Sequence, residues 1–177
     1  AGGIGVSVTQ GARLAGAATI VVADPVAERR EAALGFGATH VLDPGDVDVA
    51  AACRDLTGGV GMDYCFEAAG QAALIELGLA ASRSGGTTVC VGAPPVDQGI
   101  SIPAVVGFMA TEKRLIGSLL GSVNASRDIP RLLALAKAGR LDLAGMITDR
   151  YELADVVGAV ENLRQRRGIR TALTIAA

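Results

Sequence analysis

The sequence predicts an α/β fold, a doubly wound parallel sheet of the Rossmann type whose first strand is missing from the chain. Short apolar, β-branched segments alternate with helical segments, which is typical of successive β–α–β units. The apolar segments are continuous rather than alternating, as expected for parallel strands buried on both faces. The chain also opens with AGGIGVSVTQGARLAGAATIVVADP, a glycine-rich turn that leads into a helix, and such a turn normally follows a strand.

The first half of the chain predicts strands and helices in strict alternation. We expect strands at 17–24, 38–44, 61–70 and 87–95, and helices at 25–37, 46–59 and 71–86. Gly37 is expected to end the first of these helices, and Gly85 with Gly86 the last, because glycine is the usual residue just beyond a helix.

The second half departs from this pattern. Residues 98–106 and 113–121 are further strand candidates, and 169–175 is the final strand. Residues 128–140 predict a helix with Asp128 as N-cap, Pro130 in its first turn and Gly139 as its stop. Residues 152–167 predict another helix, one face of which is apolar: Leu153, Val156, Val157, Val160 and Leu163.

Composition excludes several classes of function. Half of the 177 residues are hydrophobic and 19% are charged, as in a globular protein, and the net charge of −2 argues against nucleic acid as a partner. No apolar run approaches a membrane span, and the N-terminus does not resemble a signal peptide. The three cysteines are widely spaced and His40 is the only histidine, so we expect reduced thiols in a cytoplasmic protein and no metal site.

The opening turn predicts a dinucleotide site. Gly2, Gly3 and Gly5, with Ile4 between them, match the later positions of G-x-G-x-x-G, so the first glycine would precede the chain. Asp24 ends the next strand 19 residues after Gly5, where an acidic residue accepts hydrogen bonds from an adenosine ribose. The alternative is a chain end of small residues with Asp24 as an ordinary helix N-cap. The motif favours the site, and with it the hypothesis that the chain is a fragment.

An ordered set of motifs spans nearly the whole chain: GGIGVSVTQGARLAGA, VVADPVAERREAALGFGATHVLDP, LTGGVGMDYCFEAAG, TTVCVGAPP, RLIGSLLGS and GIRTALTI. In this order they resemble the C-terminal half of the zinc-dependent alcohol dehydrogenases, in the medium-chain dehydrogenase/reductase superfamily. The resemblance implies a truncated NAD-binding Rossmann domain at 1–119. It also implies that 120–177 return to the catalytic domain.

The resemblance implies a role in binding NAD for residues along the whole chain. Asp24 would bind the adenosine ribose, Arg29 would flank it, and Arg170 would reach the pyrophosphate, although either arginine could be a solvated helix charge. Ala68 and Ala69 would line the adenine side of the cleft, and backbone groups of Val91, Ser118 and Leu120 would hold the nicotinamide. Gly92 and Ala93, next to Val91, are also implied cofactor-binding positions.

No catalytic or metal-binding residue is expected in this chain. The family's zinc ligands and proton relay lie upstream of the cofactor turn, and Cys53, Cys65 and Cys90 match none of them. The resemblance implies that the intact parent uses zinc and NAD to transfer a hydride between an alcohol and an aldehyde. It also implies a homodimer or homotetramer, paired through an edge strand at 98–103 that Pro103 would end.

Three other interpretations stay open. A zinc-free quinone-type reductase of the same superfamily would more often bind NADPH and carry a small or basic residue where Asp24 stands. A methyltransferase also uses a glycine turn and an acidic strand end, but it does not explain VGAPP followed by GSLLGS. The third is a non-catalytic dinucleotide-binding module, which could describe the fragment by itself.

Overall fold

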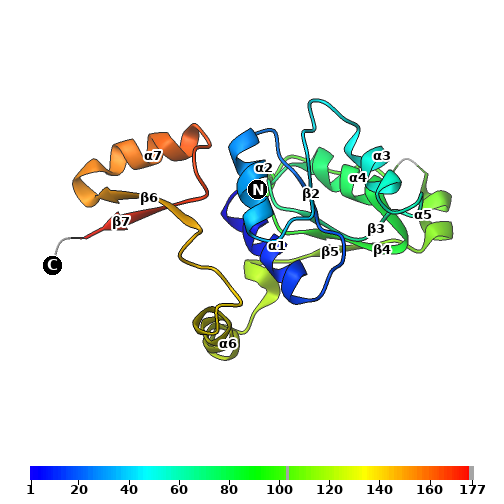
Figure 1. Cartoon of the computed structure of the whole chain (residues 1–177). Coiled ribbons are helices and arrows are strands. Elements are labelled where there is room, and N and C mark those ends of the chain that lie inside the picture. Colours follow the sequence, from blue (N-terminus) through cyan, green and yellow to red (C-terminus); the bar gives the residue numbers. More distant parts are fainter. Residues whose placement is uncertain (103, 176–177) are drawn as a thin grey trace. The chain divides into compact units, whose positions relative to one another are not determined.

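The strands form three separate hydrogen-bonded sheets in a computed structural model that describes residues 1–102 and 104–175. The sheets contain β1 with β2, β3 with β4 and β5, and β6 with β7 (Figure 1). The chain divides into two compact units, Ala1–Val41 with Asn124–Ala177 and Leu42–Val123. The predicted α/β class with parallel sheets is confirmed. The domain boundary at 119/120 stays a prediction.

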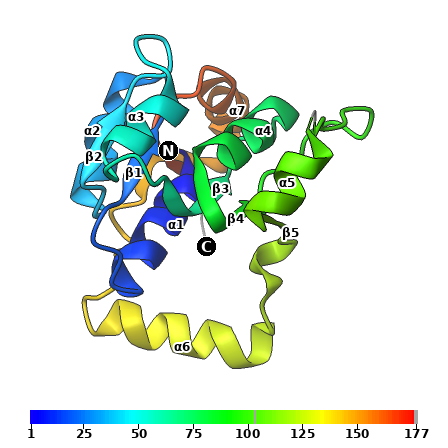
Figure 2. The same ribbon diagram turned by 90° about the vertical axis from the view of Figure 1, so that its right-hand side faces the viewer.

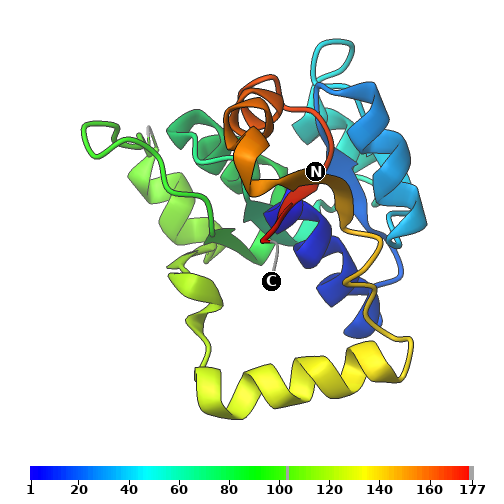
Figure 3. The ribbon, with the colours of Figure 1, turned by 90° about the vertical axis from the view of Figure 1, so that its left-hand side faces the viewer.

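The first unit begins with the glycine-rich helix. It contains α1 (Gly3–Leu14), β1 (Val21–Ala23), α2 (Ala27–Gly35), most of β2 (His40–Leu42), α6 (Ala125–Lys137), β6 (Ile147–Glu152), η2 (Leu153–Asp155), α7 (Val156–Arg164) and β7 (Arg170–Thr174). The parallel strands β6 and β7 are covered by α7 (Figure 3). As predicted, Gly37 follows α2 with a positive φ of 112°.

The core of the first unit packs α1 against residues that lie far from it in the sequence. Val6, Phe36 and Met146 form its buried apolar cluster, with Ile169 packed against it. Gln10 is fully buried, and its amide makes two bonds to Asp142: Nε2 donates to the backbone oxygen at 3.0 Å, and Oε1 accepts from the nitrogen at 2.7 Å. A buried amide whose two ends are both satisfied fixes the position of α1 relative to residue 142.

The second unit contains the three-stranded sheet. It contains α3 (Val49–Asp55), β3 (Met62–Glu67), α4 (Ala72–Ala81), β4 (Ser82–Cys90), α5 (Val105–Thr111), β5 (Arg114–Gly117) and η1 (Leu120–Ser122). The parallel register pairs Glu67 with Cys90 and Cys90 with Gly117, so the three strands end level with one another. Helix α4 packs on β3 and β4 (Figure 2). Glycine at position 78 permits this close approach, because a Cβ there would lie only 2.9 Å from the Thr88 methyl.

Two sequence predictions in this unit are wrong. The helix expected at 71–86 ends at Ala81, and β4 begins at Ser82 and includes Gly85 and Gly86. A Cβ at Gly86 would lie 2.8 Å from the Arg83 carbonyl oxygen, so this glycine permits a tight backbone turn at the start of the strand instead of ending the helix. The strand expected at 98–106 is also wrong: 98–102 form no strand, and Val105 opens α5. Pro103 lies outside the described residues.

The strand expected at 113–121 stops at Gly117, where β5 ends. Leu120, Gly121 and Ser122 then have positive φ values of 49°, 71° and 53°, which an extended strand cannot contain. Strand β6 was not predicted, because its charged residues interrupt the apolar pattern in ITDRYE. Among the described residues, no helix has both the length and the apolar character that crossing a bilayer requires.

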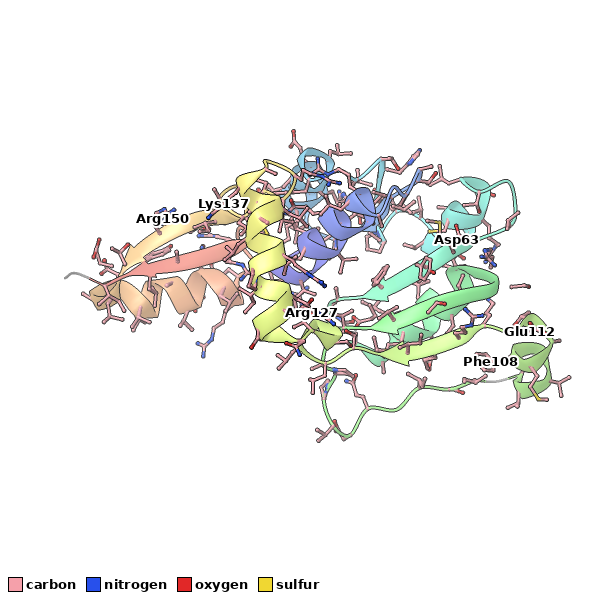
Figure 4. All side chains as sticks on the ribbon, turned by 90° about the horizontal axis from the view of Figure 1, so that it is seen from below. Asp63, Phe108, Glu112, Arg127, Lys137 and Arg150 are labelled. Atoms are coloured by element: carbon pink, nitrogen blue, oxygen red, sulfur yellow. The ribbon has the colours of Figure 1, made fainter. Side chains whose placement is uncertain are left out.

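The N-cap predicted for the helix at 128–140 is also wrong. Helix α6 begins three residues earlier, and Asn124 is its N-cap, accepting a bond from the Arg127 N–H at 3.3 Å. Asp128 lies in the first turn, where its Oδ2 accepts the Asn124 N–H at 2.9 Å and Arg127 holds its pKa below the usual range. Figure 4 shows Arg127 and Lys137 near opposite ends of the helix.

Asn124→Ala in the intact protein is expected to lower the free energy of unfolding by about 1 kcal/mol, because it removes the side-chain cap of α6. Asn124→Ser is the matched control, since serine keeps an oxygen at the same position. Urea unfolding followed by circular dichroism measures both. Equal losses in the two variants would show that the Asn124 side chain does not cap the helix.

Candidate cofactor-binding site

The N-terminal end of α1 leaves backbone donors without helical partners. Its N-cap, Gly2, makes no side-chain cap, and the first helical bond runs from the Val6 N–H to the Gly2 oxygen at 2.9 Å. The N–H groups of Gly3, Ile4 and Gly5 therefore point out of the helix end. Together with the helix dipole they give this end a partial positive charge.

Two arginines lie beside this positive helix end. A Cβ built on Gly3 would lie 3.1 Å from Nη2 and 3.5 Å from Nε of Arg170, and one on Gly2 would lie 3.7 Å from Nη1 of Arg29. Nε of Arg29 also donates to the Gly168 oxygen at 3.1 Å. A cation near a helix N-terminus is unfavourable by itself, whereas an anion bound between the N–H groups and the guanidinium groups would be stabilised by both.

Asp24 follows directly after β1 and is only 7% exposed. Its Oδ1 accepts the Val26 N–H at 2.9 Å, its Oδ2 contacts the terminal amine of Ala1, and its backbone oxygen accepts from Arg30 at 2.7 Å. The alternative role as N-cap of the next helix is wrong, because the N-cap of α2 is Val26. The structure thus brings Asp24, Arg29 and Arg170 together with the glycine turn in one compact unit.

A pocket of about 380 Å³ adjoins the helix end. Gly3, Ile4 and Arg170 form one part of its lining. The rest comes from apolar and small residues of α7 and from β7 with the residue before it: Val156, Ala159, Val160, Leu163, Ile169, Thr171 and Leu173. The charged Arg170 is therefore at the border between an apolar pocket and the N–H groups of α1.

The remaining predicted site residues lie in the second unit, after the carboxyl ends of its parallel strands. The Val91 and Gly92 N–H groups both donate to the Glu67 backbone oxygen at 2.9 Å, and the Ser118 N–H donates to the Cys90 oxygen at 2.9 Å. These bonds bring together Ala68, Ala69, Val91, Gly92, Ala93 and Ser118 at one end of the sheet. Leu120 lies two residues further on in η1 and is 86% exposed. Ligands of open α/β sheets bind at this end.

Comparisons with known proteins decide the family. A family model described as zinc-binding dehydrogenase matches residues 3–138. The chain belongs to the zinc-binding dehydrogenase family. The NDMA-dependent alcohol dehydrogenase of Amycolatopsis methanolica is 37% identical over 172 residues, which make up 96% of this chain and 46% of that protein. The chain thus spans about half the length of the curated relatives that it matches.

Solved structures of this family show the same fold. An alcohol dehydrogenase zinc-binding domain protein of Burkholderia ambifaria superposes with a TM-score of 0.94 at 32% identity, over 100% of this chain and 47% of that one. A zinc-binding dehydrogenase of Sinorhizobium meliloti 1021, solved with NADP bound, superposes with a TM-score of 0.82 at 27% identity, over 99% of this chain and 50% of that one. The predicted family, and the prediction that the chain is the cofactor-binding part of such a protein, are confirmed.

The described part of this dehydrogenase chain does not fit the zinc that the family name implies. Within residues 1–102 and 104–175, no three His, Cys, Asp or Glu side chains gather closely enough to hold a metal ion. Nδ1 of His40 instead lies 2.9 Å from the Thr39 hydroxyl. Cys53, Cys65 and Cys90 are free thiols, and burial raises the pKa of each. No step of the chemistry is therefore assigned to a metal held by these residues.

One residue at the strand ends was missed by the sequence analysis. Glu67 is the last residue of β3 and is only 4% exposed, and its side chain contacts the loop that carries Ala69. An acidic residue that closes a mostly apolar strand, followed by small residues in FEAAG, could have indicated it. Buried carboxylates are rare unless they are paired, so such a residue warrants attention.

Cys65 is expected to resist alkylation in the folded protein at pH 8. Burial, with a smaller contribution from the neighbouring Cys53, raises its pKa to about 12. Only about one thiol in ten thousand is then a thiolate at pH 8, and the thiolate is the nucleophile. Iodoacetamide treatment followed by peptide mass spectrometry measures the extent of reaction, and the same reaction in urea is the control. Rapid modification of folded Cys65 would contradict this prediction.

Proposed function

We propose that this chain is the cofactor-binding part of an NAD-dependent alcohol dehydrogenase, which in its intact form transfers a hydride between an alcohol and an aldehyde. The observation that carries the proposal is the pair of guanidinium groups beside the uncapped N-terminus of α1. The negatively charged pyrophosphate of a dinucleotide complements these positive groups. The hydroxyls of its adenosine ribose would donate hydrogen bonds to the buried carboxylate of Asp24.

The pyrophosphate would be bound by the glycine turn and Arg170. The N–H groups of Gly3, Ile4 and Gly5 would donate to its oxygens, and Arg170 would supply a full positive charge at the same place. A side chain at position 3 would meet the Arg170 guanidinium at 3.1 Å, so glycine there leaves the charge close to the helix end. The resemblance to the family supports the same assignment.

Asp24 supports NAD rather than NADP as the cofactor. Its carboxylate would accept bonds from both ribose hydroxyls but would repel a 2′-phosphate. Arg29 and Arg30 lie nearby, and the Sinorhizobium relative binds NADP, so the charges of these arginines could favour that phosphate. However, Arg29 donates to the Gly168 oxygen and Arg30 to the oxygen of Asp24 itself. We infer that the carboxylate determines the preference.

The nicotinamide would be held by backbone groups at the strand ends of the second unit. The N–H groups of Val91 and Ser118 are already bonded to protein oxygens, so these residues would contribute their carbonyl oxygens to a carboxamide. When bound, the nicotinamide supplies the hydride chemistry. The second unit's own contribution is to orient the ring.

Other features of the intact protein remain part of the proposal. Alcohols or aldehydes are the proposed substrates because the curated relatives are named alcohol dehydrogenases. These names do not favour a quinone-type reductase or a non-catalytic module. A homodimer or homotetramer, its pairing through 98–103 and a cytoplasmic location stay predictions.

The intact protein is expected to bind NAD more tightly than NADP, and Asp24→Ser is expected to narrow the ratio of the two dissociation constants by tenfold or more. The substitution removes the negative charge that would repel the 2′-phosphate. Asp46→Ser, at an exposed acidic position, is the control and should leave the ratio unchanged. Titration calorimetry measures the constants. Equal or tighter binding of NADP by the unaltered protein would overturn this assignment.

Arg170→Ala is expected to weaken NAD binding by roughly ten- to a hundredfold, the effect of losing a hydrogen bond to a charged group. Arg150→Ala is the matched control: it removes the same charge from the adjacent strand β6, where Figure 4 shows Arg150. The salt dependence of NAD binding should also become shallower in Arg170→Ala only. Equal affinities for both variants would argue against a pyrophosphate at α1.

A further inference from the structure

Glu67 bonds to both loops that follow β3 and β4. Its Oε1 accepts three backbone N–H groups of the first loop, from Ala69 and Gly70 at 2.7 Å each and from Gln71 at 3.3 Å. Its backbone oxygen accepts two from the second loop, Val91 and Gly92, at 2.9 Å each. Five backbone donors of two loops thus converge on a single residue.

The two loops touch so closely that no side chain fits between them. A Cβ at Gly92 would overlap the Gly70 nitrogen and would lie 2.6 Å from Oε2 of Glu67. Gly70 has a φ of 78°, and a Cβ there would lie 2.8 Å from the Ala93 oxygen. The spacing between the loops is therefore set by main-chain contact and by the Glu67 carboxylate behind it.

The second carboxylate oxygen has no hydrogen-bond partner among the described residues. Oε2 of Glu67 is buried, and a neutral glutamine could supply the same acceptor as Oε1 without bringing a charge into the protein. A buried charge is unfavourable unless it is fully paired, so accepting the three N–H groups of the first loop does not by itself account for glutamate at this position. Each of the five N–H groups has a partial positive charge. The Glu67 carboxylate and the Glu67 backbone oxygen together stabilise these charges.

We propose that Glu67 is a positioning residue for the nicotinamide end of the cofactor, acting through the loops at 68–71 and 91–93. The proposal rests on the proposed function, because the loop at 91–93 carries Val91, whose backbone would hold the ring. Glu67 lies behind the loops and does not itself touch the cofactor. In the proposed function the adenosine ribose and the pyrophosphate are bound through α1, Asp24 and Arg170, and Ala68 and Ala69 only line the adenine side of the cleft, so the effect of Glu67 falls on the nicotinamide.

The test compares NADH with ADP-ribose, which lacks only the nicotinamide ring. In the intact protein, Glu67→Gln is expected to raise the dissociation constant of NADH about tenfold and to change that of ADP-ribose by less than twofold. Gly92→Ala, which wedges the loops apart without changing any charge, should give the same pattern. Glu76→Gln is the matched control: Glu76 is in the same unit and also accepts a backbone N–H, from Ser101 at 2.7 Å, but it lies away from the two loops.

The outcomes separate the two proposals. An unaltered protein that binds neither ligand overturns the proposed function itself. Equal weakening of NADH and ADP-ribose, or no weakening of either, overturns the role of Glu67 while leaving the proposed function intact. If Glu67→Gln and Gly92→Ala both fail to fold, the carboxylate serves the fold rather than the position of the ring, and the proposal is also overturned.

Discussion

Backbone N–H groups that secondary structure cannot satisfy impose the strongest constraint on this molecule. At α1 the first three helical N–H groups point outward, and the chain surrounds them with glycines and arginines instead of a capping side chain. Because the dipole and both guanidinium groups have the same sign, the arrangement favours an anion at the helix end. The buried contacts of Val6 and Gln10 hold the helix in the position that this end requires.

The second unit meets the same constraint in the opposite way. Its loop N–H groups turn inward and are satisfied by one buried glutamate, so their positions are fixed before any ligand arrives. Glycines are needed at both places, but for different reasons. Gly3 leaves room for a guanidinium group, whereas Gly70 and Gly92 allow two main chains to touch.

The sequence predicted most of the elements because their apolar runs and glycine stops are local features. Strands β1 to β4 and helices α1 to α4 overlap the segments that the alternation predicted, and β5 and β7 overlap the strand candidates of the second half, although several bounds differ. One error occurs where packing against another segment overrides the local pattern, and another where the local preference is weak. Gly86 looks like a helix stop, but its space is taken by the backbone of Arg83 and Met62. Residues 98–106 look like a strand, yet Val105 and Val106 begin a helix, since β-branched residues only weakly disfavour helix.

The candidate site was predictable where a motif fixes the spacing and unpredictable where chemistry depends on burial. Arg170 stands in a run with Arg164, Arg166 and Arg167, and composition alone cannot distinguish the four. Only the fold brings Arg170 to the helix end, because β7 starts at that residue and pairs with β6. Glu67 shows the reverse case. Glu67 was visible in FEAAG from the start, but its importance comes from five backbone donors on two loops that are at least twenty residues apart in the sequence. Convergence of that kind is a property of the folded sheet, because the level ends of β3 and β4 create it.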